Sequence, residues 1–211
     1  MHETLREAII SGRLKTDERL NERDLASELG ISTTPLKEAL RQLESEGLVR
    51  IEARRGVYVT FNARRAEELI LARAALESVL ARQAARHANE THIEVMRDVV
   101  GKMQMAVANA DLMGLIELNE RFHDIIHDAS GCEYLRRLQN GQRMYHHTAR
   151  LTILAEEKER VRSHAEHESI MKAIAVGDED EAEQLMRRHV MEAGKKHISA
   201  VFETATREKQ E

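Results

Sequence analysis

Polar side chains interrupt three helical stripes in the second half of the chain that are otherwise apolar. One stripe, over residues 112–126, holds Asn119 and His123 one turn apart. His167 begins a second such stripe and His189 ends a third. Three neutral imidazole nitrogens from three helices can ligate a divalent metal, and an asparagine can add its amide oxygen. The alternative is that each histidine is a core residue bonded to a backbone carbonyl or a carboxylate.

The remaining histidines are weaker candidates. His127 follows the Asn119 pair by one turn and could support a metal ligand, whereas His164 competes with His167 for the same role. His146 and His147 are adjacent, so only one of them can face inward and line a pocket. We expect the others to lie on the surface: His87, His92 and His197.

Two arginines, Arg73 and Arg150, fall near inward-facing helix positions. A buried arginine beside a metal would bind the carboxylate of a ligand. The alternative partner is an internal carboxylate such as Glu77. Glu120 and His123 form one Glu-x-x-His pair, but a di-iron bundle needs two. A helical metalloenzyme is therefore kept only as an alternative function. A second alternative is a regulator whose metal is purely structural.

Six helices must position these groups, and their periodicity predicts them over residues 65–87, 91–108, 111–129, 132–154, 158–176 and 179–205. Leu69, Ala72, Leu76 and Leu80 give the first of them its expected inward stripe. Strand-like alternation is missing after residue 60, and the connections are short. We therefore expect an antiparallel, all-helical bundle.

The first part of the chain has a different pattern, with two short helical periods around Gly30. Gly30 suits the left-handed conformation that ends a helix, and Ser32 or Thr33 can cap the next one. Leu36, Leu40 and Leu43 form the buried stripe of that second helix. This is a helix-turn-helix, whose second helix enters the major groove of DNA. The exposed candidates for DNA contact are Thr33, Thr34, Lys37 and Arg41.

A β-hairpin is predicted after Gly47, with Arg54, Arg55 and Gly56 at its tip. Arginines at a hairpin tip can meet phosphates or enter the minor groove. The hairpin acts as a wing, so residues 1–62 are expected to form a winged helix-turn-helix with three helices. Residues 1–60 hold 10 Lys and Arg against 11 Asp and Glu, so a general nucleic-acid binder is not favoured.

Over roughly residues 4–60 the sequence resembles the GntR family of bacterial transcription regulators. The residues that carry the resemblance are Leu14, Leu20, Glu22, Leu25, Leu29-Gly30-Ile31-Ser32, Thr34-Pro35-Leu36-Lys37-Glu38-Ala39-Leu40, Leu43-Glu44, Glu46-Gly47-Leu48 and Gly56. The resemblance implies DNA contacts at Arg23, Ser32, Thr33, Thr34, Lys37, Arg55 and Gly56. The chain departs from the family at Thr16-Asp17, where Pro-Gly is usual, and at Thr33 and Lys37, where arginine is usual. A lysine lacks the planar bidentate fork of arginine.

Residues 65–205 resemble the FCD ligand-binding domain found in one branch of that family, of the FadR type. The motifs are Arg73–Glu77, Asn119–His123, Ser130-Gly131, Glu166-His167 through Gly177-Asp178, and Met186–His189. The resemblance implies metal ligands at Asn119, His123, His167 and His189, with asparagine where aspartate is more usual. Six helices are similar to the VanR-like subgroup. The metal would be zinc, with nickel or manganese as alternatives.

Composition sets the remaining expectations. The net charge of −5 is mild, and the chain has one proline and one cysteine. No apolar run approaches the ~18 residues of a membrane span, and the N-terminus has no signal-peptide pattern. We therefore expect a cytoplasmic protein without a disulfide framework or a membrane partner.

The predicted function is a DNA-binding transcriptional regulator that acts as a repressor. Its domains are residues 1–62, which bind DNA, and 63–211, which bind the effector and dimerise. A homodimer would bind a pseudo-palindromic double-stranded operator. A small carboxylate would bind beside the metal with help from Arg73, His146 and Arg150, and would alter the affinity for DNA.

Overall fold

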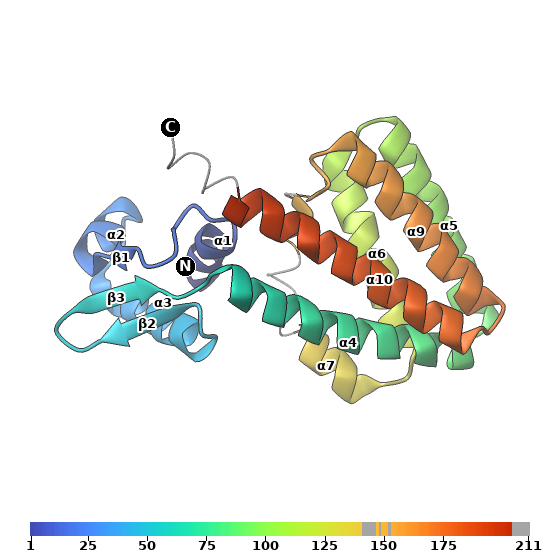
Figure 1. Cartoon of the computed structure of the whole chain (residues 1–211), viewed down its shortest axis with the longest axis horizontal. Helices are drawn as coiled ribbons and strands as arrows, with labels where there is room; N and C mark the ends of the chain where they lie inside the picture. The colour runs from blue at the N-terminus through green and yellow to red at the C-terminus, as the bar shows by residue number, and fades with distance from the viewer. Residues whose placement is uncertain (141–146, 148, 152, 204–211) are drawn as a thin grey trace.

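The computed structural model describes residues 1–140, 147, 149–151 and 153–203. Figure 1 shows a small head that holds the N-terminus and a larger bundle of helices beside it. α4 (Ala63–His87) leads from the head into the bundle. α10 (Glu179–Ile198) runs along α4 and ends next to the head. These two helices therefore connect the two parts of the molecule.

The head contains the predicted helix-turn-helix. α1 (His2–Ile10) packs on α3 (Thr33–Ser45), and α2 (Glu22–Glu28) is joined to α3 by a turn in which Gly30 has φ +64°. The Asn21 side chain caps α2 by accepting from the backbone N–H of Arg23. Leu36, Leu40 and Leu43 are fully buried, which confirms the predicted stripe. The opposite face of α3 is exposed.

The wing is the predicted hairpin of β2 (Val49–Glu52) and β3 (Gly56–Val59), which are antiparallel. Arg54 and Gly56 have positive φ angles of 65° and 118°, as the tight tip requires. A third strand, β1 (Arg19–Leu20), pairs with the other side of β3 and was not predicted. Two residues are too few to give an alternating pattern, so the sequence carries no signal for this strand.

The bundle matches the predicted helices closely. Its further elements are α5 (Glu90–Ala108), α6 (Leu112–Ala129), α7 (Glu133–Asn140) and α9 (Glu157–Ala175). The side chains of Asn62, Asn89, Asp111 and Asp178 cap the N-termini of α4, α5, α6 and α10. The predicted helix over 132–154 corresponds to α7 and to helical residues at 147, 149–151 and 153. After α10, a π-helical turn, η1 (Ser199–Glu203), continues the chain.

The inward face of α4 differs from the predicted stripe. Ala72 is exposed, and the helix instead buries Ile70, Arg73 and Glu77. The predicted stripe held only apolar residues. Arg73 and Glu77 can nevertheless be buried, because they bond to one another and Glu77 also bonds to two histidines of α6. The inward face therefore brings a charged pair into the bundle.

Buried apolar residues form two clusters, one in each part of the molecule. The head cluster extends onto Ala66 and Ile70 of α4, and Ile198 and Phe202 pack against it. A boundary at residues 62 and 63 stays a prediction, since the core of the head continues into α4. None of the described helices is long and apolar enough to cross a membrane.

Candidate metal and ligand site

Three of the four predicted metal ligands form one cluster inside the bundle. His123 comes from α6, His167 from α9 and His189 from α10, and all three side chains are buried. One nitrogen of each ring lies within 4.8 Å of the others. The ring centroids of His167 and His189 are 4.6 Å apart, and each lies 5.6 Å from that of His123. Helices far apart in sequence therefore bring three imidazoles together.

Carboxylates orient two of these rings. His123 Nδ1 lies 3.0 Å from an oxygen of Glu77, and His189 Nδ1 lies 2.7 Å from an oxygen of Glu166. A carboxylate on Nδ1 fixes the ring and leaves Nε2 to bind a metal, as outer-shell carboxylates do in metalloproteins. Glu77 also binds His127 Nε2 at 2.9 Å and the Gln139 amide at 3.0 Å. His127 thus supports the cluster through Glu77.

The rings are neutral near pH 7. Burial lowers the pKa of His123 to about 3, and burial also lowers the pKa values of His167 and His189. Burial alone would raise the pKa of Glu77, but its interactions with His123 and the hydrogen bonds from His123 and His127 hold that pKa well below its usual range. The site therefore combines neutral imidazoles with an ionised carboxylate behind them.

Several buried polar atoms at the cluster lack a hydrogen-bond partner within the described part of the chain. They are Nε2 of His123, both ring nitrogens of His167, and Oδ1 of Asn119. An unmade hydrogen bond at a buried polar atom costs about 1–3 kcal/mol, so native proteins seldom leave several together. A divalent metal accepts lone pairs from this set of atoms. The residues present fit a metal.

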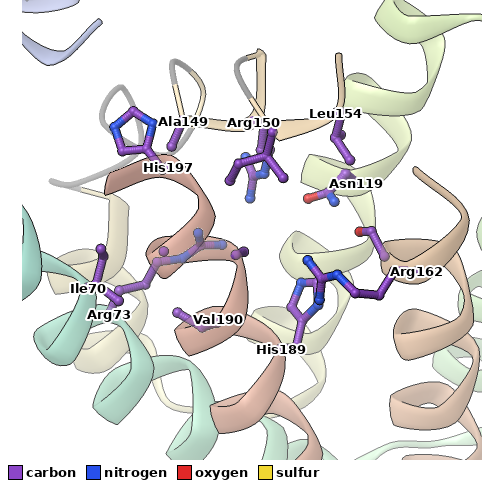
Figure 2. A pocket seen from close by; sticks show the side chains of 14 residues that line it. Ile70, Arg73, Asn119, Ala149, Arg150, Leu154, Arg162, His189, Val190 and His197 are labelled. Carbon is purple, nitrogen blue, oxygen red and sulfur yellow. The ribbon is translucent and has the colours of Figure 1, made fainter. Parts of the chain in front are cut away.

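A pocket opens beside the cluster, between α4, α6, α9 and α10 (Figure 2). Asn119 and His189 line it together with Arg73 and Arg150, whose predicted role in binding an effector stays a prediction. The cavity measures about 30 Å³, which is room for about two water molecules. Arg73 donates to Glu77 at 3.3 Å and Arg150 pairs with Glu120 at 3.3 Å, so the structure contains the internal pairing that was the alternative to ligand binding.

Arg162 also lines the pocket and was not among the residues predicted from the sequence. Its Nε donates to Glu159 at 2.7 Å and its Nη1 to Glu166 at 2.6 Å, while Nη2 is buried without a partner among the residues described. The i, i+3 and i+4 spacing of these charges is typical of a solvated helix face. Lys196 of α10 forms an ion pair with Glu159 at 3.4 Å, a tertiary contact that the sequence does not reveal.

The structure distinguishes the other histidines. His164 lies 3.2 Å from the carbonyl of Val100, so His167 rather than His164 belongs to the cluster. His147 lies 2.7 Å from Glu120, which directs that carboxylate away from a Glu-x-x-His metal pair. His197 was expected on the surface, but it is fully buried and lines the pocket. The turn of α10 around Gly194 packs against Ile70 of α4, and the next turn buries His197. His146 lies outside the described residues.

The predicted DNA-contacting residues are exposed on the head, apart from Gly56. They are Ser32, Thr33, Thr34, Lys37 and Arg41 on α3 and its N-cap, Arg23 on α2, and Arg55 at the wing tip. Gly56 is half-buried at the hairpin tip. The side chain of Lys37 is 59% exposed and lies 3.7 Å from Glu22, a pairing weak enough to yield to a phosphate or a base.

Comparisons with known proteins agree with this architecture. Residues 2–59 match the family described as bacterial regulatory proteins, gntR family, and residues 68–192 match the FCD domain. The chain is 26% identical to the uncharacterized HTH-type transcriptional regulator YdhC of Bacillus subtilis, over 92% of each chain. It is 29% identical to the HTH-type transcriptional repressor GlaR of Escherichia coli, over 89% of each. The solved structure of E. coli McbR/YncC superposes with a TM-score of 0.64 at 20% identity, over 97% of this chain and 96% of the other.

A winged helix-turn-helix joined to an all-helical domain defines a class of DNA-binding regulators. The matched families cover both parts of the chain. The chain therefore belongs to the branch of the GntR family that carries an FCD domain, and it is a transcriptional regulator rather than an enzyme.

Proposed function

We propose that the chain is a repressor whose affinity for DNA is set by a small carboxylate bound at a metal in the helical bundle. One observation carries this: unpartnered buried atoms of Asn119, His123 and His167 converge beside a pocket lined by arginines. A site with that donor set serves a cation and an anion together. Repression is supported by relatives whose names describe them as repressors, GlaR and a gluconate operon repressor of Bacillus licheniformis.

The metal would be held by Asn119, His123, His167 and His189. Zinc is the first candidate, and nickel and manganese accept the same donors. All four ligands are uncharged, since the three imidazoles are neutral and asparagine replaces a carboxylate. When bound, the cation would supply a Lewis acid that can coordinate a carboxylate oxygen. Glu77 and Glu166 hold the rings of His123 and His189 in place through their Nδ1 atoms.

The effector's carboxylate would be bound by arginines on three sides of the pocket. Arg73 and Arg150 are held in place by Glu77 and Glu120, and Arg162 presents a buried N–H. A buried arginine donates strong, charge-assisted hydrogen bonds to a carboxylate. His146, predicted to join this set, is not among the described residues.

DNA would be bound by the exposed surface of α3 and by the wing tip. A single recognition helix reads too few base pairs to select a site in a genome, so two copies would bind a pseudo-palindrome. The pocket wall formed by α4 and α10 reaches the head, where Phe61 contacts Phe202. A ligand that favours one arrangement of these helices would thereby shift the spacing of two heads.

The test compares His123→Ala with His87→Ala, an exposed histidine as the matched control. Operator fragments are first selected by retaining sheared genomic DNA on the purified protein. We expect His123→Ala to lose bound zinc and the response to carboxylates while keeping its affinity for the operator without ligand. Equal zinc content and equal responses in both variants would overturn the proposal. Zinc loss without any effector response in the parent protein would indicate a purely structural metal.

A further inference from the structure

The pocket is polar at the His189 end and mostly apolar toward the other end, where Arg73 and His197 also line it. Figure 2 shows His189, Arg162 and Asn119 on one side and Ile70 and His197 on the other. Along α10, the lining positions between the two histidines are Val190, Ala193 and Gly194, which carry no polar side chain. His189 and His197 are eight residues apart, which is about 12 Å along a helix. The pocket therefore follows α10 for roughly two turns.

The walls that face this part of α10 are also mostly apolar; the charged side chains among them, Arg73 and Arg150, pair with Glu77 and Glu120. Ile70 comes from α4, and Ala149, Ile153 and Leu154 come from the chain before α9. A hydroxyl placed against these side chains would exchange its bonds to water for contacts that cannot replace them. Methylene or aromatic groups would instead be removed from water at no such cost. This end of the pocket selects against a polyhydroxylated ligand.

The charged end presents one buried donor that is unpartnered among the described residues and could bind an anionic group. Arg73 and Arg150 each have an internal carboxylate partner, Glu77 and Glu120. Arg162 Nη2 lacks an acceptor among the described residues, although two carboxylates hold the rest of that guanidinium. This buried donor lies at the same end of the pocket as His189. One carboxylate would satisfy it.

We propose that the effector is a monocarboxylate with an aliphatic or aromatic body, bound lengthwise along α10. Its carboxylate lies at Arg162 and Asn119, and its body lies against Ile70 and Ala193. This rests on the function proposed above and names the class of acid. A hydrophobic acid fits the lining, whereas a sugar acid or a dicarboxylate leaves polar groups unpaired at the apolar end.

The body of the acid also explains how binding reaches the head. The cavity of about 30 Å³ is too small for a chain of several carbons. α4 and α10 touch there, since a Cβ added to Gly194 would stand 2.5 Å from Ile70 Cγ2. A long acid therefore separates the two helices at Ile70, a residue that is also part of the head cluster. Acetate fills only the charged end and leaves this contact closed.

The experiment titrates the zinc-loaded full chain by calorimetry with acetate, hexanoate, gluconate and adipate. The last three have equal carbon counts and differ in polarity, and the binding of each acid to zinc alone is subtracted. We expect hexanoate to bind on the order of tenfold to a hundredfold more tightly than acetate, from the burial of its methylenes. Tighter binding of gluconate or adipate than of hexanoate overturns this inference and leaves the proposed function standing. Binding of none of the four acids overturns both.

A variant locates the body of the acid. Ala193→Leu fills the apolar end, and Ala72→Leu adds the same side chain to the exposed face of α4 as the control. We expect Ala193→Leu to bind acetate normally but to lose its preference for hexanoate, and Ala72→Leu to keep that preference. A preference for hexanoate that survives in Ala193→Leu overturns the lengthwise placement.

Discussion

The ring of Phe61 lies against the ring of Phe202, with centroids 5.7 Å apart and planes tilted by 54°. Phe61 ends the head just before α4, and Phe202 lies in η1 just after α10. The pair therefore joins the head ends of the two helices that wall the pocket. Val201 reaches the head as well, since a Cβ on Gly12 would stand 2.9 Å from its Cγ1. On the proposed mechanism, these contacts would carry a shift of α10 against α4 to the head.

Phe202→Ala is expected to uncouple the pocket from DNA binding. The variant should bind zinc and carboxylates normally, because Phe202 lies away from the pocket lining. Its free energy of unfolding should fall by about 1–2 kcal/mol through the lost ring contact. DNA-binding titrations with and without hexanoate measure the response, and Phe202→Leu, which keeps an apolar side chain, serves as the control. An undiminished response in Phe202→Ala would contradict this route.

Glu166→Gln is expected to weaken metal binding without removing a ligand. The glutamine keeps the shape of the side chain but loses the charge that orients His189 Nδ1. Loss of such an outer-shell carboxylate lowers metal affinity by about 10- to 100-fold. Competition with a zinc chelator measures the change. Glu168→Gln, on the same helix but paired with Lys172 instead of a histidine, should leave the affinity unaltered; a matching loss there would point to a general electrostatic effect.

The sequence was sufficient to predict the helix-turn-helix, the wing and the three-histidine cluster. Leu36, Leu40 and Leu43 repeat at helical spacing, and glycines at 30 and 47 mark the helix ends with positive φ. These signals lie in short stretches of sequence and do not depend on contacts between helices. The histidines could be assigned to inward stripes for the same reason.

The supporting charges could not be predicted, because their burial depends on contacts between helices. Glu77 and Arg162 have the spacing of solvated charges, yet Glu77 is 1% exposed and bonds to two histidines of α6. His197 was expected on the surface because the polar end of α10 gives no hint of its packing against α4. A sequence pattern indicates which face a residue shares, but not which neighbour covers it.

The buried His197 should make stability depend on pH. Burial lowers its pKa to about 4 in the folded chain, whereas an unfolded histidine titrates near 6.5. As pH falls below 6.5, His197 becomes protonated in the unfolded chain, whereas in the folded chain it stays neutral until the pH approaches 4. Stability is therefore complete above pH 6.5 and declines below it, by about 2 kcal/mol from this residue between pH 7 and pH 5.

Urea unfolding at several pH values tests this contribution. Other buried histidines add to the slope of the parent protein, so the quantity to compare is the difference between parent and His197→Leu. We expect the variant to lose about 2 kcal/mol less than the parent between pH 7 and pH 5. Parallel pH profiles would show that folding does not lower the pKa of His197.

Asp17→Gly is expected to stabilise the head. Asp17 has φ +64°, in the left-handed region that glycine adopts without strain, and glycine is the usual residue here in the family. Its backbone N–H donates to the carbonyl of Val59, so the loop conformation is fixed. The free energy of unfolding should rise by roughly 0.5–1 kcal/mol. Thermal unfolding measures it, with Glu18→Gly, at a neighbouring position, expected to destabilise; a loss of stability in Asp17→Gly would contradict the strain.

Lys37→Ala and Arg55→Ala should weaken DNA binding in different ways. Lys37 lies in the first turns of α3, where a recognition helix meets base edges. Its loss should cost about 1–3 kcal/mol at the selected operator and little on unrelated DNA.

Arg55 lies at the wing tip with a side chain 79% exposed, a position suited to a phosphate. Its loss should weaken operator and unrelated DNA alike and reduce the slope of log affinity against log salt by about 0.9. Fluorescence anisotropy on both DNAs over a salt series separates the two, and a sequence-dependent effect at Arg55 would assign base reading to the wing instead.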